Sequence, residues 1–178
     1  MEQNNYGGKN YQIKAERIDH VGDLIYQSVL PTGEDLLTTG LQLLSIRDYR
    51  NASDILSNAI KTDPSLSDAY YYLAIALLGG KKPRKIDRWT IQDIEEKLNA
   101  AISINSNIPK YYALLAIVKH GYYVTHKWKE EPPTSMQLFK KSDSIQTKQA
   151  KEILFHLKDE DLSNPYWMDL YSKFGRLN

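Results

Sequence analysis

The sequence predicts an all-α protein in which antiparallel pairs of helices stack side by side, with a C-terminal capping helix and a short β-prone N-terminal arm. The main observation is an internal repeat. Residues 56–60 (LSNAI) match residues 98–102 (LNAAI) at an offset of 42 residues, and residues 69–74 (AYYYLA) match residues 111–116 (YYALLA) at the same offset. The second observation is that apolar residues recur every three or four positions after residue 34, which is helical spacing. Because one helix pair cannot bury its apolar face alone, a repeat of this kind predicts stacked pairs.

Composition restricts the classes of function. The chain has 178 residues, of which 42% are hydrophobic and 25% charged, as expected for one soluble globular domain. Its formal net charge of +1 argues against a general attraction to nucleic acid, which is therefore an unlikely partner. No apolar run is long enough to span a bilayer, and the N-terminus lacks a signal-peptide pattern. The absence of cysteine excludes disulfides and fits a cytoplasmic protein.

The N-terminal arm, residues 1–33, differs in pattern from the rest. Apolar and polar residues alternate over 11–15, which favours a strand. Residues 18–25 are compatible with a short helix, and 24–29 equally with a second strand. A lone hairpin is only marginally stable in water. The arm is therefore expected either to lie on the helical body or to pair with a second copy through residues 8–29, giving a homo-oligomer.

The helical domain is expected over residues 34–178, and its first pair of helices over 34–46 and 48–62. Leucine and alanine recur at helical spacing in both segments. Asp63-Pro64 ends the second helix, because proline cannot continue the helical hydrogen-bonding pattern.

The second pair is expected to begin at Ser67, a residue type that commonly caps helices. Its first helix ends at Gly79-Gly80, since glycine readily adopts the left-handed conformation found at helix ends. Its second helix is expected from Thr90, which with Asp93 resembles a capping box, through Ile102.

Further helices are expected in the C-terminal part of the chain. The first runs over about 109–123, a short one follows over 136–141, and another covers about 145–158. Asn164-Pro165 begins a final helix that Gly175 ends.

The small and apolar residues of the first pair coincide with a known repeat signature. Counting back from Pro64 as the terminal proline places these residues on signature positions: Leu36, Gly40, Leu43, Ala52, Leu56 and Ala59. The following units place fewer residues correctly: Tyr70, Leu73, Ala74 and Leu77, then Tyr112, Leu115 and Ala116. The chain thus resembles the tetratricopeptide-repeat (TPR) family over about residues 34–120. It departs from the family in its repeat distance of 42 residues rather than 34, because residues are inserted between the helices.

The resemblance implies a right-handed solenoid that serves as a non-enzymatic scaffold for protein–protein interaction. In this family the first helix of each pair forms a concave binding face. A subset of the family grips the C-terminal carboxylate of chaperones with Lys, Asn and Arg, but Leu37 and Leu41 occupy equivalent positions here, so that activity is not expected. The partner-binding residues that the resemblance implies are Leu41, Leu44, Tyr71, Ile75, Leu78, Ile117 and His120.

Two interpretations of this apolar face remain open. An exposed groove would accept an apolar segment of a protein or peptide partner. Alternatively the chain covers the face itself, with the helix over 165–174 or with the N-terminal arm.

The inserted segments suggest a second surface, because both follow first helices of pairs and should meet at one edge of the stack. Basic and aromatic residues are interleaved there: Lys81, Lys82, Arg84, Arg88, Trp89, His126 and Trp128. Such a pattern suits nucleic acid, another polyanion or an acidic partner, and it equally suits a solvated loop packed on its own aromatic rings.

Catalytic and metal-binding patterns are absent from the sequence. The four histidines lack metal-ligand spacing, no cysteine nucleophile exists, and Gly79-Gly80-Lys81-Lys82 lacks the spacing of a phosphate-binding loop. We therefore expect no cofactor, no metal and no enzymatic activity. A small acid–base site at His120 and His126 is the least favoured alternative.

Overall fold

The computed structural model describes residues 31–157 and 163–175, and all regular structure in these residues is helical. The prediction of an all-α domain is therefore confirmed for this part of the chain. The chain divides into two units, Met1–Pro31 and Thr32–Asn178, and the description below concerns the second unit. The predicted strands and the oligomer-forming segment 8–29 lie outside the described residues.

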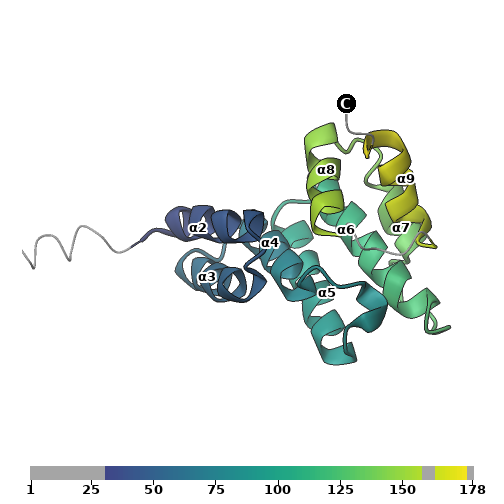
Figure 1. Cartoon of the computed structure of the whole chain (residues 1–178), viewed down its shortest axis with the longest axis horizontal. Helices are drawn as coiled ribbons and strands as arrows, with labels where there is room; N and C mark the ends of the chain where they lie inside the picture. The colour runs from purple at the N-terminus through teal and green to yellow at the C-terminus, as the bar shows by residue number, and fades with distance from the viewer. Residues whose placement is uncertain (1–30, 158–162, 176–178) are drawn as a thin grey trace, which may run out of the picture. The chain divides into compact units, whose positions relative to one another are not determined.

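Successive helices pack against one another along the first part of this unit (Figure 1). Each of these helices contacts the next one in the chain. Their bounds are α2 (Gly33–Ser45), α3 (Tyr49–Thr62), α4 (Ser67–Leu78), α5 (Arg88–Ile104) and α6 (Pro109–Lys119).

A glycine allows the first two helices, α2 and α3, to pack closely against each other. A Cβ atom at Gly40 would lie 2.6 Å from Cγ and Cδ2 of Leu56, so only glycine fits at this crossing of α2 and α3 without a shift. Leu56 is fully buried there, together with Ala52 and Ala59 of the same helix. The predicted helical spacing of α3 therefore does form the apolar face of the pair.

The 42-residue repeat is visible in the backbone. α3 ends at Asp63 with φ −140° and ψ 95°, and α5 ends at Asn105 with φ −140° and ψ 94°. In both places the capping side chain accepts a hydrogen bond from the backbone N–H two residues later, at 2.9 Å from Ser65 and at 3.2 Å from Asn107. Ala59 and Ala101 therefore occupy equivalent, fully buried positions on equivalent helices.

Two helix starts differ from the expectation. Ser67 is the first residue of α4 rather than its N-cap, and its hydroxyl bonds to the Tyr111 hydroxyl at 2.9 Å. α5 begins two residues before Thr90, because Asp87 accepts hydrogen bonds from both the backbone N–H and the hydroxyl of Thr90. The carboxylate is the stronger acceptor and takes the capping role.

The inserted segments form short helical turns that touch each other. A 3-10 turn, η1 (Pro83–Lys85), follows α4, and a π-helical turn, η2 (His120–Val124), continues directly from α6. Gly121 lies so close to Pro83 that an added Cβ would be 3.2 Å from its ring. The prediction that the two insertions meet at one edge is confirmed.

Three further helices, α7 (Ser135–Lys140), α8 (Thr147–His156) and α9 (Pro165–Phe174), follow a loop. The buried Lys119 ammonium fixes that loop by donating to the carbonyls of Glu131 and Pro133 at 2.6 and 2.7 Å. All three helices pack on α6, and α8 and α9 lie side by side (Figure 1). Among the described residues, no helix is long and apolar enough to cross a membrane.

Candidate functional site

The predicted concave face is part of the core. Leu44, Tyr71, Ile75, Leu78 and Ile117 are all buried, and Leu41 and His120 are partly buried. The prediction that these residues line an open partner groove is therefore corrected. The chain covers part of this face itself, because Glu152 of α8 lies near Tyr71, and Asn164 and Tyr166 at the start of α9 contact Ile117 and His120.

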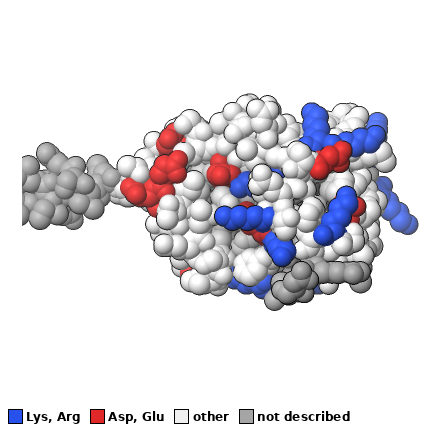
Figure 2. Space-filling model, turned by 90° about the horizontal axis from the view of Figure 1, so that it is seen from above, with Lys and Arg blue, Asp and Glu red and all other residues white. Residues whose placement is uncertain are grey.

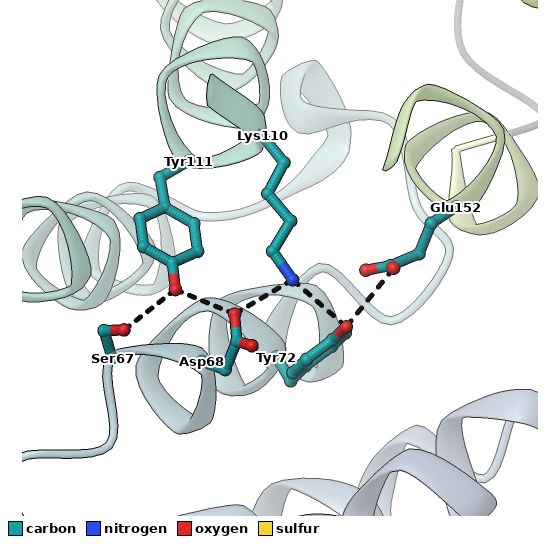
Figure 3. Close-up of polar contacts among 6 residues, drawn as sticks. All are labelled: Ser67, Asp68, Tyr72, Lys110, Tyr111 and Glu152. Carbon is teal, nitrogen blue, oxygen red and sulfur yellow. Dashed lines mark hydrogen bonds and ion pairs between the residues drawn. The ribbon is translucent and has the colours of Figure 1, made fainter. Parts of the chain in front are cut away.

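A polar network fixes α8 to the helix stack (Figure 3). It begins with the Lys110 ammonium, which lies 2.9 Å from Oδ1 of Asp68 and donates to the Tyr72 hydroxyl at 3.2 Å. The Tyr72 hydroxyl in turn donates to Oε2 of Glu152, on α8, at 3.2 Å. On the other side, Tyr111 donates to Asp68 at 2.7 Å. The Tyr72–Glu152 hydrogen bond thus joins residues that are 80 positions apart in the chain.

Aromatic rings surround the cation of this network. Lys110 is only 6% exposed. Its ammonium lies 4.5 Å from the ring centres of both Tyr71 and Tyr72 and 5.7 Å from that of Tyr111. Ring faces attract a desolvated cation, so the rings partly replace the water that the ammonium has lost. The ammonium is therefore occupied within the protein and is not presented to a ligand.

Burial also shifts the pKa values of several groups in this network. Desolvation raises the pKa of Glu152 above its ordinary value, although Lys110 and the Tyr72 hydroxyl act in the opposite direction. Burial is likewise the main reason that the pKa values of Tyr71 and Tyr72 are raised, so both phenols stay protonated. The network therefore connects α4, α6 and α8.

The C-terminal end of α8 is held by the turn between α2 and α3. The Arg47 guanidinium donates to the Phe155 carbonyl at 2.9 Å and lies 4.8 Å from the centre of the Phe155 ring. Arg47 has φ 62°, in the left-handed region that favours glycine, just after the end of α2. Glycine would suit this backbone but could not make either contact. His156 packs edge-on against Tyr49, with 6.0 Å between the ring centres.

Between α8 and α9 lies an open groove with a volume of about 1060 Å³. Leu154 and Phe155 of α8 contribute to one wall, and α9 supplies the other. The α9 wall consists of large apolar and aromatic side chains: Trp167, Met168, Tyr171 and Phe174. Phe155 and Tyr171 are 45% and 47% exposed. The groove is therefore an accessible apolar surface of the kind that binding sites use.

Positive charge borders this groove on the α8 side. Arg47, Lys148 and Lys151 line it, and among the described residues of the lining the single carboxylate is the partly buried Glu152. Lysine and arginine predominate where the C-terminal helices lie, whereas acidic side chains gather toward the end where α2 lies (Figure 2). The groove thus combines an apolar interior with a basic rim.

The second predicted surface is assembled from both insertions. The Arg88 guanidinium lies 5.9 Å from the centre of the Trp128 ring, which joins the start of α5 to the loop after η2. His126 packs against Trp128, with 5.1 Å between ring centres, and Trp89 is 81% exposed. The remaining predicted residues, Lys81, Lys82 and Arg84, belong to the first insertion. Exposed carboxylates accompany them, notably Asp87 and Glu131.

His120 and His126 pack against different aromatic partners. His120 packs edge-on against Tyr166 at 5.3 Å, and its pKa is lowered by burial. His126 instead packs against Tyr122 and Trp128. Within the described residues, no group of three His, Asp or Glu side chains could hold a metal ion.

The groove residues were not singled out from the sequence. One indication was available, because Trp167, Tyr171 and Phe174 recur at i, i+4 and i+7 on the final helix, which defines an apolar stripe. The complementary stripe on α8 was less visible, since it mixes Lys148 and Lys151 with Phe155.

No protein-family model matches the chain, and no curated protein matches it significantly.

Proposed function

We propose that this protein is a non-enzymatic, TPR-like scaffold that binds an apolar segment of a partner protein in the groove between α8 and α9. One observation carries the proposal: the face used by the family the chain resembles is filled by the chain itself, while a large apolar groove stays open beside it. The 42-residue repeat of backbone caps supports a solenoid of related helix pairs. The lack of cysteine is consistent with a location in the cytoplasm.

The lining of the groove supports binding rather than catalysis. Phe, Trp, Tyr and Arg are the residues that most often anchor protein interfaces, and all four types occur in this groove. Two of the charged groups that line the groove are engaged within the protein, since Arg47 holds the end of α8 and Glu152 accepts from Tyr72.

Site-specific cross-linking tests the proposal. A benzoylphenylalanine at position 155 should capture a partner protein, and the same group at Met136, which is 60% exposed and lies outside the groove, should not. Tyr171→Glu should abolish capture from position 155, because a carboxylate would be placed in the apolar wall. Equal capture from positions 155 and 136 would contradict the proposal.

A second candidate function uses the edge formed by the insertions. The exposed Trp89 and the Arg88–Trp128 contact would suit a nucleic acid or another polyanion, because aromatic faces and cations alternate there. This function predicts that a labelled single-stranded oligonucleotide binds with steep salt dependence and that Lys82→Glu with Arg84→Glu removes the binding.

A further inference from the structure

The two walls of the groove differ in chemistry, and this difference restricts what can occupy it. On α8, Lys148, Lys151 and Phe155 follow one another at intervals of three and four residues, so they share one helix face. On α9, the stripe through Trp167, Tyr171 and Phe174 carries no charge. An occupant must therefore meet cations along one side and aromatic rings along the other.

From this arrangement we propose that the partner segment is an acidic amphipathic helix of about three turns, an inference that rests on the proposed function. Its apolar stripe would lie against α9 and Phe155, and carboxylates beside that stripe would face Lys148, Lys151 and Arg47. Helix-in-groove recognition uses this combination of an apolar face and flanking charge.

The proposed length of the partner helix follows from the lengths of α8 and α9. α8 and α9 have 10 residues each, which corresponds to about 15 Å at 1.5 Å per residue. A helix lying along the groove can therefore present about three turns to both walls. Apolar residues at i, i+3, i+4 and i+7 cover this distance on one face.

The proposed negative charge of the partner helix follows from the lysines that border the groove. Lys148 and Lys151 are exposed, and neither forms an ion pair with another described residue. Glu152, the one acid among the described residues that line the groove, is already hydrogen-bonded to Tyr72. A basic helix would bring like charges together along α8, while an acidic helix would meet opposite charge there.

The shape favours a helix over a lipid surface. Membrane-binding elements present their apolar and basic residues on a convex face. Here the apolar residues line a recess between two helices, and the cations border only one side of it.

Two matched peptides test the inference on the full-length protein. Each has about fifteen residues and the same apolar stripe, with Glu at the flanking positions in one and Lys in the other, and binding is followed by fluorescence anisotropy. We expect the acidic peptide to bind about tenfold more tightly at low salt, and this preference to shrink at high salt because exposed charges are screened. Lys148→Glu with Lys151→Glu should reverse the preference.

The control variant is Lys85→Glu with Lys129→Glu, which changes the net charge equally at exposed lysines outside the groove and should keep the preference for the acidic peptide. Equal affinities for the two peptides, both abolished by Phe155→Glu, would overturn the acidic-helix inference and leave the proposed groove function standing. Peptide binding that Phe155→Glu does not affect would overturn both. Binding to anionic vesicles, but to neither peptide, would overturn the inference in favour of a membrane surface.

Discussion

At the scale of single residues, the closeness of the helices depends on small side chains. Gly40 occupies the crossing of α2 with α3, and fully buried alanines, Ala74 and Ala116, occupy the corresponding repeat positions on α4 and α6. A close-packed core has no free volume to absorb a larger group at such a point, so an added side chain must displace its neighbour.

Gly40→Val should therefore destabilise the protein by about 2 kcal/mol, because the branched side chain would overlap Leu56. Urea unfolding followed by circular dichroism measures the effect. Gln42→Val is the control, since Gln42 is exposed on the same helix and its replacement should cost under about 0.5 kcal/mol. Equal costs for the two variants would show that α2 and α3 are not in close contact at Gly40.

A second residue-scale prediction concerns His156. Burial, and secondly the Arg47 charge, lower its pKa from 6.5 to about 4. As the pH falls, His156 therefore takes up a proton in the unfolded chain before it does so in the folded protein. The stabilisation is complete above pH 6.5 and is lost between pH 6.5 and 4, by about 3 kcal/mol in total. The free energy of unfolding at pH 7, 5.5 and 4.5 should fall less steeply for His156→Phe than for the wild type.

The variant comparison is needed because other groups titrate in the same range with the opposite sign. Burial raises the pKa of Glu152, so its contribution is present at low pH and is lost as the pH rises through the folded-state value. Subtracting the His156→Phe curve from the wild-type curve removes this contribution. Parallel curves would show that His156 does not titrate differently in the folded and unfolded states.

At the scale of secondary-structure elements, α8 buries Ala150, Ile153 and Leu154 in the core and is also held at two places by polar contacts. Glu152 connects its middle to α4, and Arg47 binds its last turn. Positive charge at a helix C-terminus is also favourable to the helix dipole. These polar contacts therefore help to hold the α8 wall of the proposed groove in place.

Lys110→Met should accordingly destabilise the protein by about 3 kcal/mol, because it leaves the Asp68 and Glu152 carboxylates without their cation. Adding Glu152→Gln should recover part of this loss, since the amide can accept from Tyr72 without a buried charge. A double-mutant cycle on unfolding free energies measures the coupling between the two positions. Strictly additive effects would show that Lys110 and Glu152 do not interact.

The helices themselves could be predicted from the sequence, because their causes are local. Gly79 and Gly175 end helices, Asn164 caps α9 and Asp63 follows α3, each within the range of one helical turn. The start of α5 was placed wrongly, because the pattern of Thr90 and Asp93 resembles a capping box, whereas Asp87 makes the actual cap. Competing caps of this kind differ in stability by only about one hydrogen bond.

The binding face could not be predicted, because its exposure depends on contacts between distant residues. The bond between Tyr72 and Glu152 spans 80 residues and leaves no local pattern. A partial indication existed in the runs 69–78 and 111–118, which are apolar on nearly every side. A helix that is apolar all round is normally buried on all sides, as α4 and α6 are.

At the scale of the whole molecule, most of the partner-binding residues predicted from the sequence are buried. The accessible apolar groove lies instead between the C-terminal helices α8 and α9. The proposed groove is formed mainly by α8 and α9, which lie outside the repeat, and Arg47 is its contribution from the first repeat unit. Sequence differences in α8 and α9 would alter binding without changing the repeated core, and changes in the core would alter stability first.

The N-terminal arm carries the remaining whole-molecule prediction, that residues 8–29 join copies of the chain. Removing residues 1–30 leaves Thr32, whose hydroxyl and backbone N–H form the capping box of α2 with Asp35. The helical domain should therefore retain its circular dichroism spectrum and lose less than about 1 kcal/mol of stability. If the arm pairs copies, sedimentation equilibrium should show an oligomer for the full chain and a monomer for the truncated one, because the unpaired strand edges that attract a second copy are gone. An unchanged association state would exclude the arm as the oligomerising element.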